Sequence, residues 1–351
     1  MRTEIEHPEL AGAGAGGGTV VLDDATAATV KARGYWEGVW LRFKQDRVAI
    51  AGGVFIVVLL LSAFIGGPIA ARILGHGPNE IFANGVIDSK PVGPLTTIST
   101  APFPTPPGTK GFEDTTFLLG SDGPLGHDMF LRILYGAQTS LEVAVMATIL
   151  VMIIGVITGL LAGYYRGTVD TIVSRLTEIA MAFPFLLFTI AVAVTVGPSV
   201  NKITFGFLAP GVVTLTMIFA IFGWFYPARL VRGQVLSLRE KEFIEAARMT
   251  GAGDWRIMRS HLLPHLVAPI IVFSTLIVAS YIIAEAGLSF LGLGIQAPTA
   301  SWGNLLSAGP EYYLTQPWLM VWPGLMILLT TLAFNLLGDG LRDAFDPRHI
   351  S

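Results

Sequence analysis

The stretch EFIEAARMTGAGDWRIMRSHLLPH, Glu242–His265, decides how the chain is interpreted, because it is polar and lies between two of the most apolar regions of the sequence. Over all 351 residues, 52% are hydrophobic and only 13% are charged, against about a quarter charged in an average soluble domain. The mean hydropathy is +0.64. This composition indicates a membrane protein in which Glu242–His265 is a water-exposed loop between two spans.

Two short helices joined by a turn are predicted within this loop. The first runs from Glu240 to Thr250 and ends at Gly251, which accepts the left-handed backbone conformation of a helix C-cap. Asp254 is placed to cap a second helix that begins at Trp255. Pro264 is expected to break this second helix where the next apolar span begins.

The first of these helices has a face of small residues. Ala246 and Ala247 leave that face without bulk, so the surface of another protein can approach the backbone closely. A simple connector between spans needs neither a small-residue face nor a placed glycine and cap. We therefore interpret the loop as a docking segment.

Six apolar runs are long enough to cross a bilayer, because about 20 residues of helix cover its core of about 30 Å. These runs are 48–73, 141–164, 179–196, 208–230, 266–287 and 318–337. With the N-terminus inside, 17 of the 22 Lys and Arg residues fall in cytoplasmic segments, as the positive-inside rule requires. Both termini and the docking segment are then expected to be cytoplasmic.

The parts outside the spans suggest the remaining organisation. Residues 1–33 form a flexible cytoplasmic tail that contains the Gly-rich run AGAGAGGGT. Residues 34–47 form an amphipathic interfacial helix, with Trp36, Val39, Trp40 and Phe43 on one face. Residues 74–134 form an external loop, and their Pro, Gly and Thr content favours little regular structure. Residues 135–347 form the core domain, with the docking loop at 240–264.

Several functions are excluded or disfavoured by the residues. The chain has no cysteine and no Gly-Lys pair, which excludes disulfides and a P-loop ATPase site. A net charge of −3 gives no reason to expect a nucleic-acid partner. His261 and His265 lack the Glu of a zinc-protease motif, so we expect no metal site and no catalytic residues. An intramembrane protease is disfavoured for the same reason.

Ionisable residues within spans are costly and often functional. Glu285 lies near the outer end of the fifth predicted span. It is interpreted either as a polar lining or hinge contact of a transport pathway, or as a structural residue hydrogen-bonded at the interface.

The docking loop resembles the EAA loop of bacterial ABC importer permeases, in which E-A-A, three residues, G, nine residues, I, one residue and L-P follow one another. The matching residues are Glu245, Ala246, Ala247, Gly251, Leu263 and Pro264, and His261 replaces the usual Ile. LGSDGPLGHDMFLRILYGAQTSL, residues 119–141, is similar to dipeptide and oligopeptide permeases of the DppC/OppC type, although His127 and Gln138 replace two arginines. GLLAGYYRGTVD, AEAGLSFLGLGIQAPTASWGNLL and LAFNLLGDGLRDAFDPR also resemble this subfamily.

The resemblance implies a type I ABC importer permease fold with six transmembrane helices and a cytoplasmic coupling helix, in a bacterial inner membrane. It also implies a second permease subunit, two ATPase subunits that hold ATP and Mg, and an external solute-binding protein, with no cofactor bound by this chain. Dipeptide, oligopeptide, glutathione and nickel importers share this permease type, so the substrate stays open. An ion-coupled secondary transporter is the more distant alternative, for which inverted repeats and midplane charges would be expected.

Overall fold

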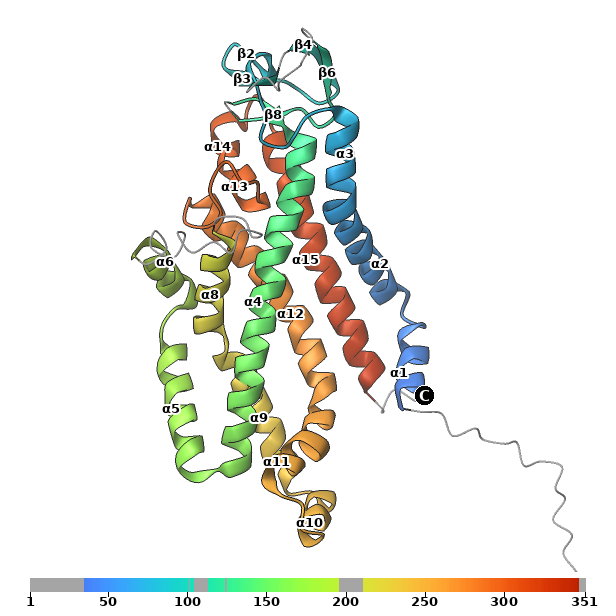
Figure 1. Cartoon of the computed structure of the whole chain (residues 1–351), viewed down its shortest axis with the longest axis vertical. Helices are drawn as coiled ribbons and strands as arrows, with labels where there is room; N and C mark the ends of the chain where they lie inside the picture. Colours follow the sequence, from blue (N-terminus) through green and yellow to red (C-terminus); the bar gives the residue numbers. More distant parts are fainter. Residues whose placement is uncertain (1–34, 101, 104–112, 124, 196–210, 347–351) are drawn as a thin grey trace, which may run out of the picture.

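The longest helix, α4 (Met129–Tyr165), forms the centre of a bundle in the computed structural model, which describes residues 35–346 except 101, 104–112, 124 and 196–210 (Figure 1). Around α4 pack α8 (Val212–Gly223), α9 (Phe225–Arg239) and α12 (Leu263–Phe290). The last long helix, α15 (Trp318–Phe345), packs against α12 and α2 (Arg47–Leu61). The predicted tail 1–33 lies outside the described residues.

Five helical segments of the described chain are long and apolar enough to cross a membrane, and a bent pair of helices makes a sixth if it is counted as one span. The five segments are Arg47–Leu74, Met129–Tyr165, Val212–Arg239, Asp254–Phe290 and Trp318–Phe345. The prediction of a helical membrane protein is therefore confirmed, with five to six spans, although these helices extend beyond the predicted runs at one end or both.

The third predicted span, 179–196, is wrong as a continuous helix. The chain forms α5 (Gly167–Ala182) and α6 (Phe185–Thr195), which are bent by 85° relative to each other. Pro184 explains the break, because its ring excludes the helical conformation for the residue before it. Phe183 accordingly has an extended backbone, with φ −87° and ψ 134°. Figure 1 shows α6 turned outward from the bundle.

A glycine stripe brings α4 and α9 into close contact. Gly155, Gly159 and Gly163 recur every four residues and therefore share one face of α4. A methyl group on Gly155 would lie 2.5 Å from Pro227 Cγ, and one on Gly163 would lie 2.7 Å from Val235 Cβ. As in other membrane helices, small residues let two backbones approach where larger side chains would separate them.

The N-terminus of α4 is capped by a buried carboxylate. Asp128 Oδ1 accepts hydrogen bonds from the backbone N–H groups of Phe130 (2.8 Å) and Leu131 (3.4 Å). Burial raises the pKa of Asp128, although the His76 imidazole, with Nε2 3.5 Å from Oδ2, acts to lower it. The cap anchors the start of the central helix directly after the external segment.

At the other end of the bundle, α1 (Tyr35–Phe43) packs against the last turn of α15. The Trp36 and Phe345 rings are 6.1 Å apart, and Arg42 donates to the Asp346 carbonyl at 2.6 Å. The four residues predicted to share one face are divided, because Val39 is buried whereas Trp36 and Trp40 are exposed. The chain then enters α2, a π-helical turn η2 (Ser62–Gly66) and α3 (Gly67–Leu74).

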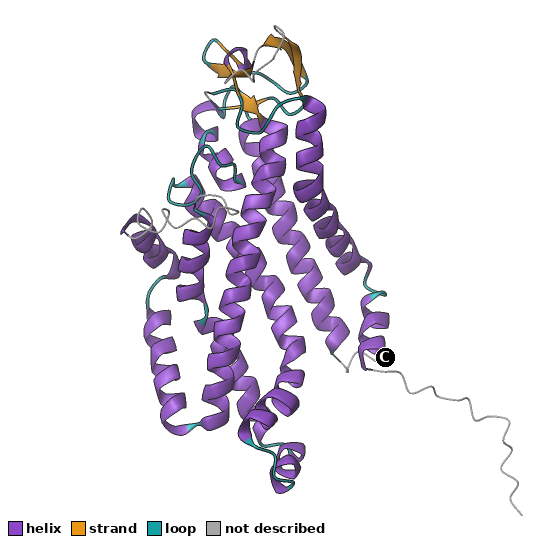
Figure 2. Ribbon diagram, viewed as in Figure 1, coloured by secondary structure: helices purple, strands orange, loops and turns teal. Residues whose placement is uncertain are grey.

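The external segment contains more regular structure than predicted. Its described residues pair into two-stranded antiparallel sheets (Figure 2), and α4 already begins within the predicted loop 74–134. Phe82, Val92 and Phe117 form a small buried core there, which gives the strands an apolar face to cover. The strands are β1 (Ile81–Phe82), β2 (Val86–Ile87), β3 (Lys90–Pro91), β4 (Thr96–Thr100), β5 (Pro102–Phe103), β6 (Glu113–Phe117), β7 (Ser121–Asp122) and β8 (His127–Asp128).

Two short helices, α13 (Trp302–Ser307) and α14 (Gly309–Tyr312), follow α12 on the side of the β strands. Ser301 and Asn304 form a reciprocal capping box at the start of α13. The Trp302 indole is fully buried and donates to the Ile133 carbonyl of α4 at 3.1 Å. These contacts hold the connection between α12 and α15 against the central helix.

Candidate functional site

The predicted docking loop lies at the end of the molecule opposite the β strands (Figure 1). It consists of α10 (Glu242–Met249), α11 (Asp254–Arg256) and a π-helical turn η4 (Ile257–Leu262) that leads into α12. The loop is therefore helical on both sides of one turn, as predicted.

The turn after α10 has the hydrogen bonds of a Schellman motif. Ala252 N–H donates to the Ala247 carbonyl at 3.0 Å, and Gly251 N–H donates to the Arg248 carbonyl at 2.9 Å. Gly251 has a φ of +82°, which confirms its predicted role as the left-handed residue that ends the helix. This motif fixes the angle between α10 and α11.

The predicted role of Asp254 as a helix cap is wrong. Gly253 occupies the cap position, and Asp254 Oδ1 instead accepts a hydrogen bond from the Tyr164 hydroxyl at 2.6 Å. Tyr164 is the penultimate residue of α4, and its backbone carbonyl also accepts from Arg239 of α9 at 2.7 Å. Tyr164 therefore links the turn to both α4 and α9, a role that no spacing in the sequence indicated.

The predicted break at Pro264 is also wrong, because the helix continues without interruption from Asp254 to Phe290. A π-helical turn precedes the proline, and Leu263 N–H bonds to the Met258 carbonyl five residues earlier. Pro264 stands in the first turn of α12, where proline is tolerated because it lacks a backbone N–H that would need a partner. The second short helix and the fifth span are thus one element.

The two alanines of the Glu-Ala-Ala triplet face different environments. Ala247 and Ile244 are buried against α4 and α9, whereas Ala246 and Glu245 are exposed. Adjacent residues on an α-helix point about 100° apart, so the small-residue face proposed for both alanines is divided between a packed side and an open side. Of the two alanines, only Ala246 is available to a partner.

An apolar cluster seats the docking loop on the bundle. It joins buried residues of α10, η4 and α12 to the lower ends of α4 and α9; its members include Leu160, Val231, Val235, Ile244, Ile257, Leu262 and Leu266. Apolar burial against α4, α9 and α12 attaches the loop to the bundle. The opposite side of the loop carries exposed Met249 (83%) and Trp255 (69%), two large apolar side chains that sequence reasoning did not single out.

Leu263 and Pro264, the last two residues of the EAA pattern, lie on α12. Leu263 is half-buried and Pro264 is exposed. Pro264 lines a cavity of about 330 Å³ with Trp36 of α1 and Phe345 of α15. These two residues therefore form the base of the docking loop.

Glu285 is fully buried in α12 and has hydrogen-bond partners on two sides. Ser140 of α4 donates to its Oε2 at 2.8 Å, and Ser289 donates to its Oε1 at 2.7 Å. Each serine oxygen also accepts a backbone N–H, from Trp302 at 3.3 Å and from Ile295 at 3.0 Å. The carboxylate thus connects α4 and α12 to the segment that follows α12, which is the hydrogen-bonded environment of the structural interpretation; a role in a pathway or as a hinge stays a prediction.

The two departures from the permease pattern near α4 both have partners. His127 Nδ1 lies 2.9 Å from Asp122 Oδ1, and Arg132 Nε lies 2.5 Å from the other oxygen of Asp122. Gln138 donates to the Ala63 carbonyl in η2. No group of three or more His, Asp or Glu side chains suited to a metal ion occurs in the part of the chain that the structure describes.

Taken together, these elements define a multi-span helical membrane protein with a helical loop, α10 to η4, seated on one end of the bundle. Residues 155–351 match the family model described as binding-protein-dependent transport system inner membrane component, and residues 34–90 match that of the N-terminal TM domain of oligopeptide transport permease C. The chain belongs to this family of inner-membrane transport components.

Curated relatives are similar over nearly the whole chain. The dipeptide transport system permease protein DppC of Bacillus subtilis is 38% identical over 315 residues, which is 90% of this chain and 86% of the relative. The glutathione transport system permease protein GsiD of Pectobacterium atrosepticum is 37% identical, covering 89% and 91%. The oligopeptide permease OppC of B. subtilis is 34% identical, covering 93% of each chain.

A solved structure of the MetNI methionine ABC transporter, in an inward-facing conformation, contains a chain with the same fold. The TM-score is 0.50 at 17% identity, and the match covers 62% of this chain and 98% of that chain. At this identity the likeness concerns the fold alone.

Proposed function

We propose that this chain is one of two permease subunits of an ATP-driven peptide importer, and that α10 is the helix by which a separate ATPase subunit moves it. The seating of α10 carries the proposal: Ile244 and Ala247 fix one side to the bundle, while Glu245 and Ala246 leave the other side open. The names of relatives that transport dipeptides, oligopeptides and glutathione support a peptide substrate.

The mechanism follows from this rigid attachment. Closure of an ATPase pair would displace α10, and the apolar cluster beneath it would pass the displacement to α4, α9 and α12. The spans would then exchange an inward-open for an outward-open arrangement, and the ATPases act by favouring one of the two. A solute-binding protein that docks to only one arrangement would bias the same equilibrium from outside.

In the proposed assembly this chain binds no cofactor, and ATP with Mg is held by the two ATPase subunits. The second permease completes the pathway, membrane lipid surrounds the spans, and no nucleic acid takes part. Both termini and α10 face the cytoplasm, as the distribution of Lys and Arg favours. The β strands, at the opposite end of the bundle, then face the binding protein.

Charge reversal at Glu245 tests the docking role. Glu245 is exposed, so Glu245→Lys should leave folding and membrane insertion intact while it abolishes co-purification of the ATPase and coupled uptake. Glu311→Lys, a charge reversal at another exposed glutamate, in α14 at the opposite end of the bundle, is the matched control and should retain co-purification of the ATPase. Normal ATPase binding and uptake by the Glu245 variant would show that α10 does not couple the subunits.

The substrate is tested with the complete transporter in proteoliposomes. Uptake of a dipeptide, a longer peptide, glutathione and Ni²⁺ is compared at saturating concentration of the cognate binding protein. Peptide uptake that depends on ATP is the expected result. Uptake of Ni²⁺ without uptake of any peptide would refute the proposed substrate class.

A further inference from the structure

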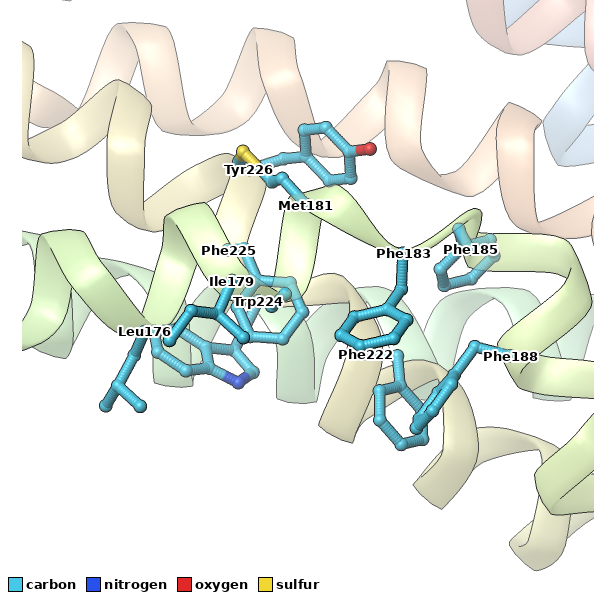
Figure 3. Close-up of a pocket in the computed structure, with 11 residues that line it drawn as sticks. Leu176, Ile179, Met181, Phe183, Phe185, Phe188, Phe222, Trp224, Phe225 and Tyr226 are labelled. Atoms are coloured by element: carbon cyan, nitrogen blue, oxygen red, sulfur yellow. The ribbon is translucent and has the colours of Figure 1, made fainter.

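An aromatic cavity lies at the break between α5 and α6. Its walls come from the bend between α5 and α6 and from the junction of α8 with α9 at Trp224, and its volume is about 270 Å³. Figure 3 shows Phe183, Phe188 and Phe222 grouped at this bend. Interrupted helices at membrane depth are tolerated where they are buried in protein or line a cavity.

The cavity is apolar and open to the surface. The Phe188 and Phe222 rings pack edge to face with centroids 4.5 Å apart, and Phe183 lies 5.5 Å from Phe188. On the outer side, Ile179, Phe183 and Tyr226 each expose more than half of their side-chain surface. Such a site has the size and chemistry to receive one aromatic or large aliphatic side chain.

A cation lies directly beside this cavity. Arg229 of α9 is exposed and lines a neighbouring cavity of about 160 Å³ that shares Met181 with the aromatic cavity; its guanidinium lies 3.8 Å from the Met181 sulfur. Neighbouring arginines are neutralised: Arg232 forms a two-point ion pair with Asp170, and Arg175 pairs with Glu178 at 2.7 Å. Among the ion pairs of the described residues, none involves Arg229.

We propose that the aromatic cavity and Arg229 form a transient binding site for the transported peptide. The cavity receives an apolar side chain, and Arg229 receives the terminal carboxylate by charge-assisted hydrogen bonds. Arg229 is exposed and is one of the arginines assigned to the cytoplasmic side, so it is open to water, and a peptide carboxylate is an anionic ligand that can take the place of this water. This proposal rests on the proposed function as a peptide permease and adds a selectivity that the permease itself imposes.

Uptake by the complete transporter, with its binding protein saturated by each peptide, tests both halves of the site. One pair of peptides differs in a free or amidated C-terminus, and the other differs in Phe or Ala as the C-terminal residue. Arg229→Gln should lower the uptake ratio of free acid to amide by about tenfold, the usual worth of a hydrogen bond to a charged group. Arg229→Lys should recover most of it. Phe222→Ala should lower the ratio of the Phe peptide to the Ala peptide.

Arg175→Gln is the matched control, because it removes the same charge from α5 at a residue that lines neither the aromatic cavity nor the neighbouring cavity of Arg229. It should change neither ratio. ATPase activity stimulated by the loaded binding protein is measured in parallel, so that a loss of coupling is distinguished from a loss of selectivity. Unchanged ratios in both site variants, with coupling intact, would overturn the proposal.

A second measurement does not depend on the variants folding. A peptide that carries a photoreactive phenylalanine analogue should label the wild-type chain at α5, α6, α8 or α9 during turnover, and labelling confined to other helices would overturn the proposal. If the wild-type transporter takes up no peptide at all, the proposed function fails. If it takes up peptides while the ratios and the label do not support the site, only the present inference fails.

Discussion

Replacing Gly159 by alanine tests whether the glycine stripe on α4 sets the distance to α9. The added methyl group would lie 2.9 Å from Val231 Cβ and 3.1 Å from Ala228 Cα, closer than side-chain carbons normally approach. Overpacking of this kind costs about 1–3 kcal/mol. Alanine gains about 1 kcal/mol over glycine inside a helix, so the net loss of stability should be up to about 2 kcal/mol.

The assay is thermal unfolding of the purified chain in detergent, followed by the loss of monodisperse protein. Gly233→Ala is the matched control, because it makes the same change on α9 where no atom lies within 4 Å of the added methyl group. It should raise the melting temperature, whereas Gly159→Ala should lower it. If both variants are stabilised alike, α9 does not pack on the stripe as closely as described.

Three further changes probe other contacts. Tyr164→Phe removes the 2.6 Å hydrogen bond to Asp254 and should lower the local stability of the turn after α10 by about 1 kcal/mol. Amide hydrogen exchange in the turn should then be faster, and unchanged exchange would contradict a stabilising contact between Tyr164 and Asp254. Trp302→Phe removes the buried indole hydrogen bond to the Ile133 carbonyl, which keeps its donor within α4, and should cost about 1 kcal/mol in thermal unfolding; a wild-type melting temperature would argue against this contact. Burial raises the pKa of Asp128 in the folded chain above its ordinary value of 3.8, so the stability of the folded state should fall as pH rises from 3.8 to the raised pKa. Asp128→Asn keeps the cap and should flatten this fall in a pH series of melting temperatures. Equal slopes for the wild type and the variant would refute the argument.

The sequence was sufficient for elements that depend on local chemistry. Apolar runs located the spans, because each run must cover the same bilayer thickness. Gly251 located the end of α10, because few other residues accept a φ of +82°. Pro184 was visible in the sequence as a source of a kink, but the size of a kink depends on what packs beside it, and here α5 and α6 diverge by 85°.

Features that depend on tertiary contacts could not be predicted. Asp254 follows a turn and has a side chain suited to capping, yet the Tyr164 hydroxyl, 90 residues away in sequence, binds it instead. Ala246 and Ala247 are indistinguishable in the sequence, and only the position of α4 and α9 decides which is buried. The strands of the external segment form around three buried side chains that no local periodicity identified.

The continuous helix from Asp254 to Phe290 has its irregularities at one end. The π-helical turn at Ile257–Leu262 and Pro269, which lacks a backbone N–H inside the helix, both depart from the regular hydrogen-bond ladder near the docking loop. From Ile270 to Phe290 the helix contains no proline and no π turn. Bending stiffness is therefore lowest next to α10 and highest toward Glu285. A displacement at the loop is thus expected to tilt the outer three-quarters of α12, Ile270–Phe290, as a stiff rod about a compliant base. A small angle at one membrane face then becomes a larger excursion at the other.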